Sequence, residues 1–117
     1  MVAFDGSATG HKTLQRLASS PLCEGLPIHI VMVGTDSEEN QNELGKARTT
    51  LASSGQLVHA EIRPGEVESV LHAYQAEHGI DLLVMGAYGH SRIRQFLVGS
   101  TTTTMLRTST LPVLLLR

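Results

Sequence analysis

Short apolar runs alternate along the chain with longer segments in which apolar residues recur every three or four positions. Five short runs have the length of β-strands: Met1–Phe4, Ile28–Val33, Leu57–Ile62, Asp81–Met85 and Leu111–Leu116. Strands that alternate with helical patterns are typical of a parallel sheet whose connections are helices. The pattern therefore predicts an α/β fold built as βαβαβαβαβ.

Apolar stripes at helical spacing fill the segments between these strands. The stripes are Ala8, His11, Leu14, Leu17 and Ala18; Leu44, Ala47 and Leu51; Val67, Val70, Leu71 and Tyr74; and a last helix from about Gly99 to Thr108. Ser37 is a good N-cap for the second helix, and Pro21, Gly55 and Gly79 mark the ends of the first three.

Two strands show where they lie in the sheet. Residues 58–63 alternate between apolar and polar, which is typical of an edge strand with one wet face. Residues 82–85 are all apolar, which is typical of a strand covered on both faces. Pro112 lacks an N–H donor, so we expect it at the start of the last strand or on an edge.

Right-handed crossovers place the first three strands in the order 3-2-1, and strand four then falls on the other side of strand one. The prediction is one domain over residues 1–117, a three-layer α/β sandwich whose parallel sheet has the order 3-2-1-4-5. Ligands of such sheets bind beyond the carboxyl ends of the strands where the order reverses. Asp5 and Gly86 end the two strands at this point, so we expect them to face one crevice.

Composition and charge exclude several classes of partner. The net charge is −2 and 3% of residues are aromatic, which argues against a nucleic-acid surface. No run of about 18 apolar residues predicts a membrane span, and no basic region followed by an apolar run predicts a secretory signal. Cys23 is the single cysteine, which fits a reducing compartment. We expect a cytoplasmic protein.

Glycines and hydroxyls after strand four form the candidate chemistry. Gly86-Ala87-Tyr88-Gly89 is followed nine residues later by Gly99-Ser100-Thr101, which opens the last predicted helix. Free N–H groups at a helix start attract phosphate, and His90, Arg92 and Arg94 supply nearby cations. Neither the P-loop nor the dinucleotide pattern is present. From the glycines alone, a plain strand-to-helix turn is the favoured interpretation.

The G-x2-G-x9-G-S spacing, preceded by Val84-Met85 and followed by Leu111–Arg117, resembles the universal stress protein family. The strand end Ala3-Phe4-Asp5-Gly6-Ser7 resembles it too, so the likeness covers nearly the whole chain. In the ATP-binding branch, the resemblance implies phosphate contacts at Gly86, Gly89, Gly99, Ser100 and Thr101, with Ala87, His90 and Arg92 in the same site. It places Asp5 by the ribose, with Mg²⁺ carried by the nucleotide, and an adenine slot at Ala3, Val33 and Met85.

The resemblance also implies a homodimer or a tandem pair joined through the last strand, at Val113, Leu114, Leu115 and Leu116. The chain is shorter than the family pattern, and its abrupt start resembles the second half of a tandem protein. The expected function is an ATP-binding stress-response regulator with at most slow hydrolysis. Two alternatives stay open: a dimerisation or protein-interaction module without nucleotide, and an enzyme that uses the nucleotide.

Other constellations are weaker. Six histidines are present, but no two have the i, i+3 or i, i+4 spacing that places two metal ligands on one helix face. We therefore expect surface or structural histidines and no resident metal. Neither Ser7 nor Ser100 lies in a G-x-S-x-G motif, so no hydrolase triad is expected.

Overall fold

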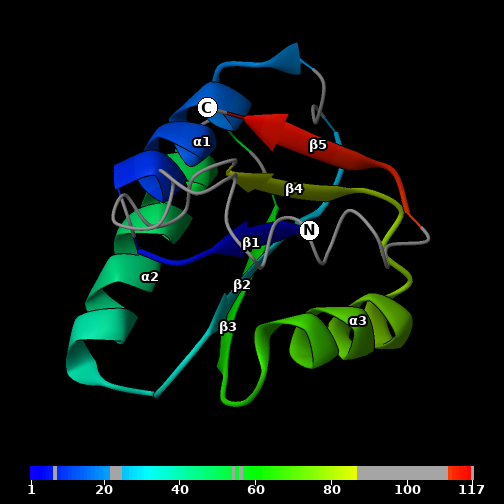
Figure 1. Ribbon diagram of the computed structural model, residues 1–117. Helices are drawn as coiled ribbons and strands as arrows, with labels where there is room; N and C mark the ends of the chain where they lie inside the picture. The colour runs from blue at the N-terminus through cyan, green and yellow to red at the C-terminus, as the bar shows by residue number, and fades with distance from the viewer. Residues whose placement is uncertain (7, 22–24, 54, 56, 87–110, 117) are drawn as a thin grey trace, which may run out of the picture.

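The computed structural model describes residues 1–6, 8–21, 25–53, 55, 57–86 and 111–116 of the chain (Figure 1). Its elements are β1 (Val2–Phe4), α1 (Ala8–Ala18), β2 (Ile28–Val33), α2 (Glu38–Ala52), β3 (Val58–Arg63), α3 (Val67–His78), β4 (Leu83–Gly86) and β5 (Val113–Leu116). They agree in type and order with the predicted elements. The predicted helix from Gly99 to Thr108 lies outside the described residues.

All strand pairs in the sheet are parallel, and the strand order is β3-β2-β1-β4-β5. This confirms the predicted order and places its reversal at β1. The central strand β1 pairs with β2 through Val2↔Ile30 and with β4 through Val2↔Val84. β3 lies at one edge, as its alternating pattern predicts, and β5 lies at the other.

Two apolar clusters cover the two faces of the sheet, and Figure 1 shows α1 and α2 on one side with α3 on the other. The larger cluster joins the α1 and α2 side of the sheet, where Phe4, Leu14 and Leu51 are buried. The smaller joins the α3 side, where Val31, Leu71 and Met85 are buried. Even-numbered and odd-numbered residues of β2 enter opposite clusters, as the two-residue period of a strand requires. The predicted three-layer sandwich is confirmed.

Helix ends follow the predicted cap residues with one difference. The Ser37 hydroxyl accepts the Asn40 N–H at 3.1 Å, and Gly79 ends α3 in the left-handed conformation at φ +60°. The helix α2 ends at Ala52, three residues before the predicted stop at Gly55. The Ser53 N–H bonds back to the Thr49 carbonyl, and Gly55 (φ +85°) belongs to the turn that follows.

The strand boundaries differ from prediction by one or two residues. β4 begins at Leu83 rather than Asp81, because the Leu83 N–H donates to the Pro112 carbonyl at 3.1 Å, where pairing with β5 starts. Pro112 thus lies immediately before β5, where its missing N–H costs the sheet no hydrogen bond. Asp81 is exposed, as expected of a residue ahead of a buried strand.

We predict that Leu14→Ala lowers the free energy of unfolding by about 2–5 kcal/mol, because Leu14 is fully buried and its truncation leaves a cavity. Leu57→Ala is the matched control. The Leu57 side chain is 65% exposed, so the loss there is expected to stay below about 0.5 kcal/mol. Urea unfolding of both variants measures the difference, and equal losses would contradict the placement of the core.

Candidate functional site

The carboxyl ends of β2, β1 and β4 lie next to one another where the strand order reverses. Phe4 pairs with Met32, so Asp5 and Val33 are the next residues along their two strands. Ala3 pairs with Met85, and Gly86 ends β4. The structure thus brings together the predicted site residues of three strands that are far apart in the sequence.

The three residues of the predicted adenine slot belong to one apolar cluster. Met85 is buried within it, and Ala3 and Val33 are half-buried and pack against it. The cluster lies on the α3 face, where Val31 and Leu71 form its floor. An apolar surface of half-buried side chains at a strand end suits a flat, largely apolar ring.

Asp5 follows β1 and is exposed, and α1 comes very close to it. A Cβ on Gly10 would lie 3.0 Å from the Phe4 ring and 3.2 Å from the Asp5 carboxylate. Glycine at this position therefore allows the first turn of α1 to pack directly on the end of β1.

An ion pair connects α1 to α2 beside the same strand end. His11 Nε2 lies 2.5 Å from Glu43 Oε2, and Lys46 Nζ lies 3.4 Å from Glu43 Oε1. The hydrogen bond with His11, and then that with Lys46, holds the pKa of the Glu43 carboxyl below its ordinary value. A Cβ on Gly6 would contact Met32 and the Glu43 side chain, so the pair flanks the turn that follows β1.

The turn after β2 is held by side chains of the first turn of α2. The Asn40 amide donates to the Thr35 carbonyl at 2.8 Å, and Gln41 donates to Asp36. The Gly34 N–H donates to the Arg63 carbonyl at 2.9 Å, which continues the β2–β3 pairing beyond Val33. These bonds order the backbone beside the candidate crevice.

Several predicted site residues lie outside the described residues. They are Ala87, Gly89, His90, Arg92, Gly99, Ser100 and Thr101, together with Arg94. The phosphate-binding part of the prediction therefore stays a prediction. Of the predicted loop, the structure describes the first glycine, Gly86, which pairs with Leu116 of β5.

Sequence reasoning missed a group of aromatic and charged side chains between the sheet and α3. The His29 ring contacts those of His59, His78 and Tyr74. Tyr74 also stacks with His78, and Arg63 lies over the Tyr74 ring. The histidines come from three elements, so spacing within one helix does not reveal them. One sequence signal could have indicated this group. Histidine is the second residue of both β2 and β3, and the parallel register pairs His29 with His59.

Within the described ranges, no group of three His, Cys, Asp or Glu side chains is arranged to hold a metal ion. The helices described also include none that is long and apolar enough to cross a membrane.

Comparison with known proteins matches residues 31–117 to the universal stress protein family. The chain belongs to the universal stress protein family. It is also 44% identical, over its whole length, to the universal stress protein Slr1230 of Synechocystis sp.. The chain spans 42% of the length of that relative.

Other solved structures share the fold. The hypothetical protein MJ0577, solved for the assignment of its biochemical function, superposes with a TM-score of 0.83 at 20% identity, covering 98% of this chain and 93% of its own. A universal stress protein solved in complex with cAMP superposes with a TM-score of 0.80 at 23% identity, covering 99% and 94%. At these sequence identities the likeness supports a shared fold and no shared ligand or activity.

We predict that Gly10→Ala stabilises this universal stress protein domain less than Gly45→Ala does. Both glycines lie in helices, where alanine gains about 0.5–1 kcal/mol in an open position. A Cβ meets nothing within 4 Å at Gly45 but crowds Phe4 and Asp5 at Gly10. Urea unfolding compares the two variants, and an equal gain would show that the contact between α1 and β1 is loose.

Proposed function

We propose that this domain binds an adenine nucleotide, ATP with Mg²⁺, and acts in the cytoplasm as a nucleotide-dependent regulator of a stress response. The observation that carries the proposal is the meeting of Ala3, Asp5, Val33, Met85 and Gly86 at one strand-order reversal. Three strands contribute these residues. Open parallel sheets bind their ligands at this position.

Each described residue has a chemical role in this proposal. Ala3, Val33 and Met85 offer the adenine an apolar surface backed by the α3-side cluster. Asp5 presents a carboxylate to the ribose hydroxyls and to the Mg²⁺ that accompanies the phosphates. Gly86 begins the loop whose Gly89, Gly99, Ser100 and Thr101 we assign to the phosphates from the family resemblance.

The solved relative in complex with cAMP supports an adenine site on this fold. cAMP and ATP share adenosine, so the same apolar surface suits both. They differ in the phosphates, which the loop after β4 would distinguish. A titration with both ligands therefore separates recognition of the adenosine from recognition of the triphosphate.

A second function, dimerisation, is favoured by the position of β5. This strand forms the edge of the sheet and pairs with β4 through Val113–Leu116, in a run of apolar residues. An apolar edge strand offers backbone N–H and C=O groups to a further strand. We propose a homodimer, or a pair with a second universal stress protein domain, joined through β5.

We predict that Gly89→Val abolishes the heat of Mg-ATP binding in calorimetric titration while the domain stays folded. A β-branched side chain would fill the space that the phosphates need. Gly45→Val is the matched control, because a side chain there meets nothing within 4 Å. Circular dichroism checks the fold of both variants.

Unchanged ATP affinity in Gly89→Val would show that the loop is a plain turn. An absence of heat from the unmodified protein at high concentration would favour the module without nucleotide. Rapid release of AMP and pyrophosphate would favour an enzyme.

We predict a molecular mass of twice 12.6 kDa in light scattering at high protein concentration, because pairing along β5 covers an apolar edge. Dilution should shift the mass toward that of one chain. A mass of 12.6 kDa at all concentrations would contradict the homodimer. Pairing of β5 with a second universal stress protein domain would then be the remaining form of the proposal.

A further inference from the structure

Three imidazoles and one tyrosine lie together between the sheet and α3, at the amino end of β2 and β3, and the His29 ring contacts the other three. The ring centroid of His29 lies 4.9 Å from that of His59, 5.2 Å from that of His78 and 5.5 Å from that of Tyr74. Tyr74 and His78 stack at 4.2 Å. We call His29, His59, His78 and Tyr74 the imidazole cluster.

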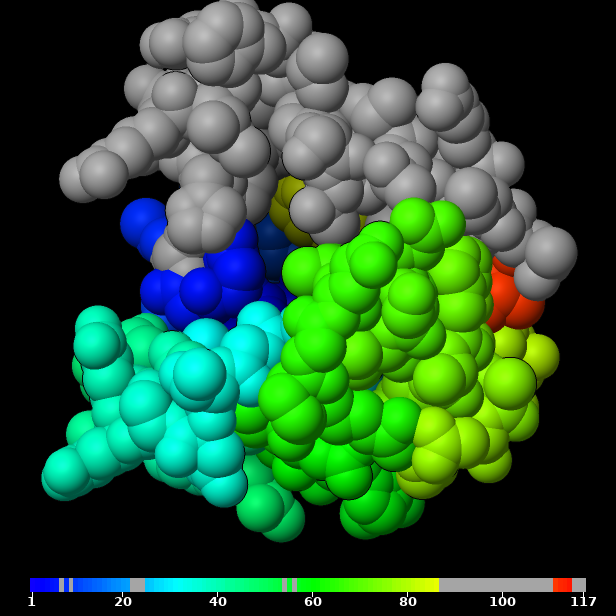
Figure 2. All heavy atoms as spheres, turned by 60° about the horizontal axis from the view of Figure 1, so that its bottom comes forward, coloured from blue at the N-terminus to red at the C-terminus, as the bar shows by residue number. Residues whose placement is uncertain are grey.

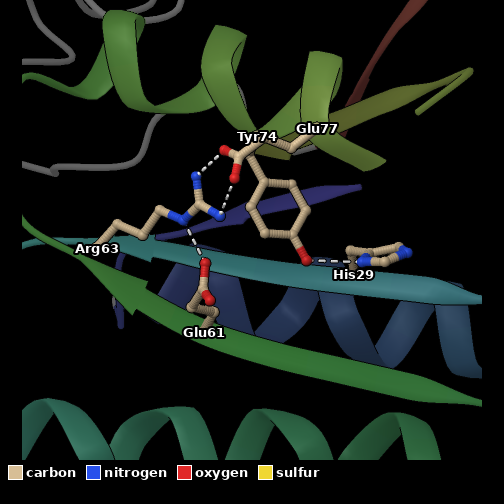
Figure 3. Close-up of polar contacts among 5 residues, drawn as sticks. All are labelled: His29, Glu61, Arg63, Tyr74 and Glu77. Atoms are coloured by element: carbon tan, nitrogen blue, oxygen red, sulfur yellow. Dashed lines mark hydrogen bonds and ion pairs between the residues drawn. The ribbon is translucent and has the colours of Figure 1, made fainter. Parts of the chain in front are cut away.

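The fold places these four side chains together by register and by helical period. His29 and His59 are directly paired residues of parallel strands, so both side chains lie on the α3 face. Tyr74 and His78 are one helical turn apart on α3, so both face the sheet. The Tyr74 hydroxyl lies 2.6 Å from His29 Nδ1, and this hydrogen bond joins α3 to β2 (Figure 3).

One cation and two carboxylates lie beside the cluster. The Arg63 guanidinium lies 4.7 Å from the Tyr74 ring centroid, on the opposite side from His29 (Figure 3). Glu61 and Glu77 are both ion-paired with Arg63. The hydrogen bond with Arg63 is the main cause that holds the pKa of the Glu77 carboxyl below its ordinary value, and the neighbouring His78 acts in the same direction.

Water reaches the cluster from two directions. His59 and His78 are exposed at its rim, on the surface formed by β3 and α3 (green in Figure 2). His29 is half-buried and, with His78 and Asp81, lines a hollow of about 160 Å³ at the amino ends of β1, β2 and β4. Burial, and then the neighbouring His59 and His78, lower the pKa of His29, and the Met1 amino group adds to the same effect.

We propose that the imidazole cluster is an acid-sensitive latch, which holds α3 on β2 and β3 while its rings are neutral and loosens that helix when they are protonated. Imidazolium ions within about 5 Å of one another repel, and the half-buried ring of His29 lies next to both other imidazoles. Glu61 and Glu77 lie at the Arg63 side of the cluster, where both are ion-paired. Of the groups that face the cluster, Asp81 supplies an opposite charge on the hollow side. This inference concerns acidification and does not depend on the proposed nucleotide.

The sign of the effect follows from linkage between protons and folding. The pKa of His29 is lowered from 6.5 in the folded domain, so the unfolded chain takes up this proton first as pH falls. Stability is therefore full above pH 6.5 and is lost below it. Between pH 6.5 and the lowered pKa of His29, the unfolding equilibrium constant should rise by up to about tenfold per pH unit.

The test is hydrogen exchange of the whole chain at pH 7.5 and pH 5.5, with EDTA present and intrinsic rates corrected. Protection of the α3 amides should fall about tenfold more than that of the α2 amides, because the cluster joins α3 to the sheet. The double variant His59→Gln, His78→Gln should show a smaller difference, since His29 then loses its imidazole neighbours while its burial remains. Both pH values stay above the range in which Glu43 and Glu77 titrate.

His11→Gln is the matched control, because His11 pairs with Glu43 on the other face of the sheet and should leave the α3 response intact. Equal loss of protection in α2 and α3 would overturn the proposal, as would a double variant that keeps the full response. A response that appears when EDTA is omitted, and only then, would assign the histidines to a metal and also overturn it. If the double variant does not fold, His59→Gln alone should reduce the response, and an unchanged response would contradict the latch.

Discussion

The three-residue strand β1 is the element on which the rest of the structure depends. It pairs in parallel with β2 on one side and β4 on the other, so it joins both halves of the sheet. The chain leaves β1 toward β2 and returns on its far side at β4, and this reversal opens the crevice at its end. Gly10 contributes to the same junction by allowing α1 to lie against Phe4 and Asp5. The strand pairing of β1, the packing of α1 on it and the candidate site at Asp5 therefore all lie at the end of one short strand.

The two faces of the sheet are built differently. The face under α1 and α2 is apolar, and Phe4, Leu14 and Leu51 form a continuous core there. The face under α3 is apolar toward Met85 and Leu71 but becomes aromatic and charged toward β3. Hydrophobic contact is indifferent to pH, whereas imidazoles respond to it near neutrality. The α3 layer is thus the part of the fold whose attachment depends on solution conditions.

Sequence alone predicted the order of the strands, and with it which strand ends lie together, because apolar periodicity and crossover handedness determine both. It also predicted the caps at Ser37 and Gly79, because the side-chain hydroxyl of serine and the backbone freedom of glycine determine these helix ends locally. It did not predict the stop of α2 at Ala52, since Ser53 is the C-cap and Gly55 belongs to the turn that follows. The imidazole cluster was missed because it needs the register of β2 against β3, which no single segment encodes. The loop from Ala87 to Thr101 stays a prediction.

Strand β2 carries His29, Val31 and Val33 on one face, so the imidazole cluster and the adenine surface that we propose lie on one strand, about 13 Å apart. Thermodynamic reciprocity applies to any two ligands that act on one such element. A nucleotide that tightens the contact of β2 with α3 must make proton uptake harder by the same factor. Acid, in turn, would weaken nucleotide binding although the protonated histidines do not contact the nucleotide. The same strand would then respond both to pH and to the nucleotide concentration in the cell.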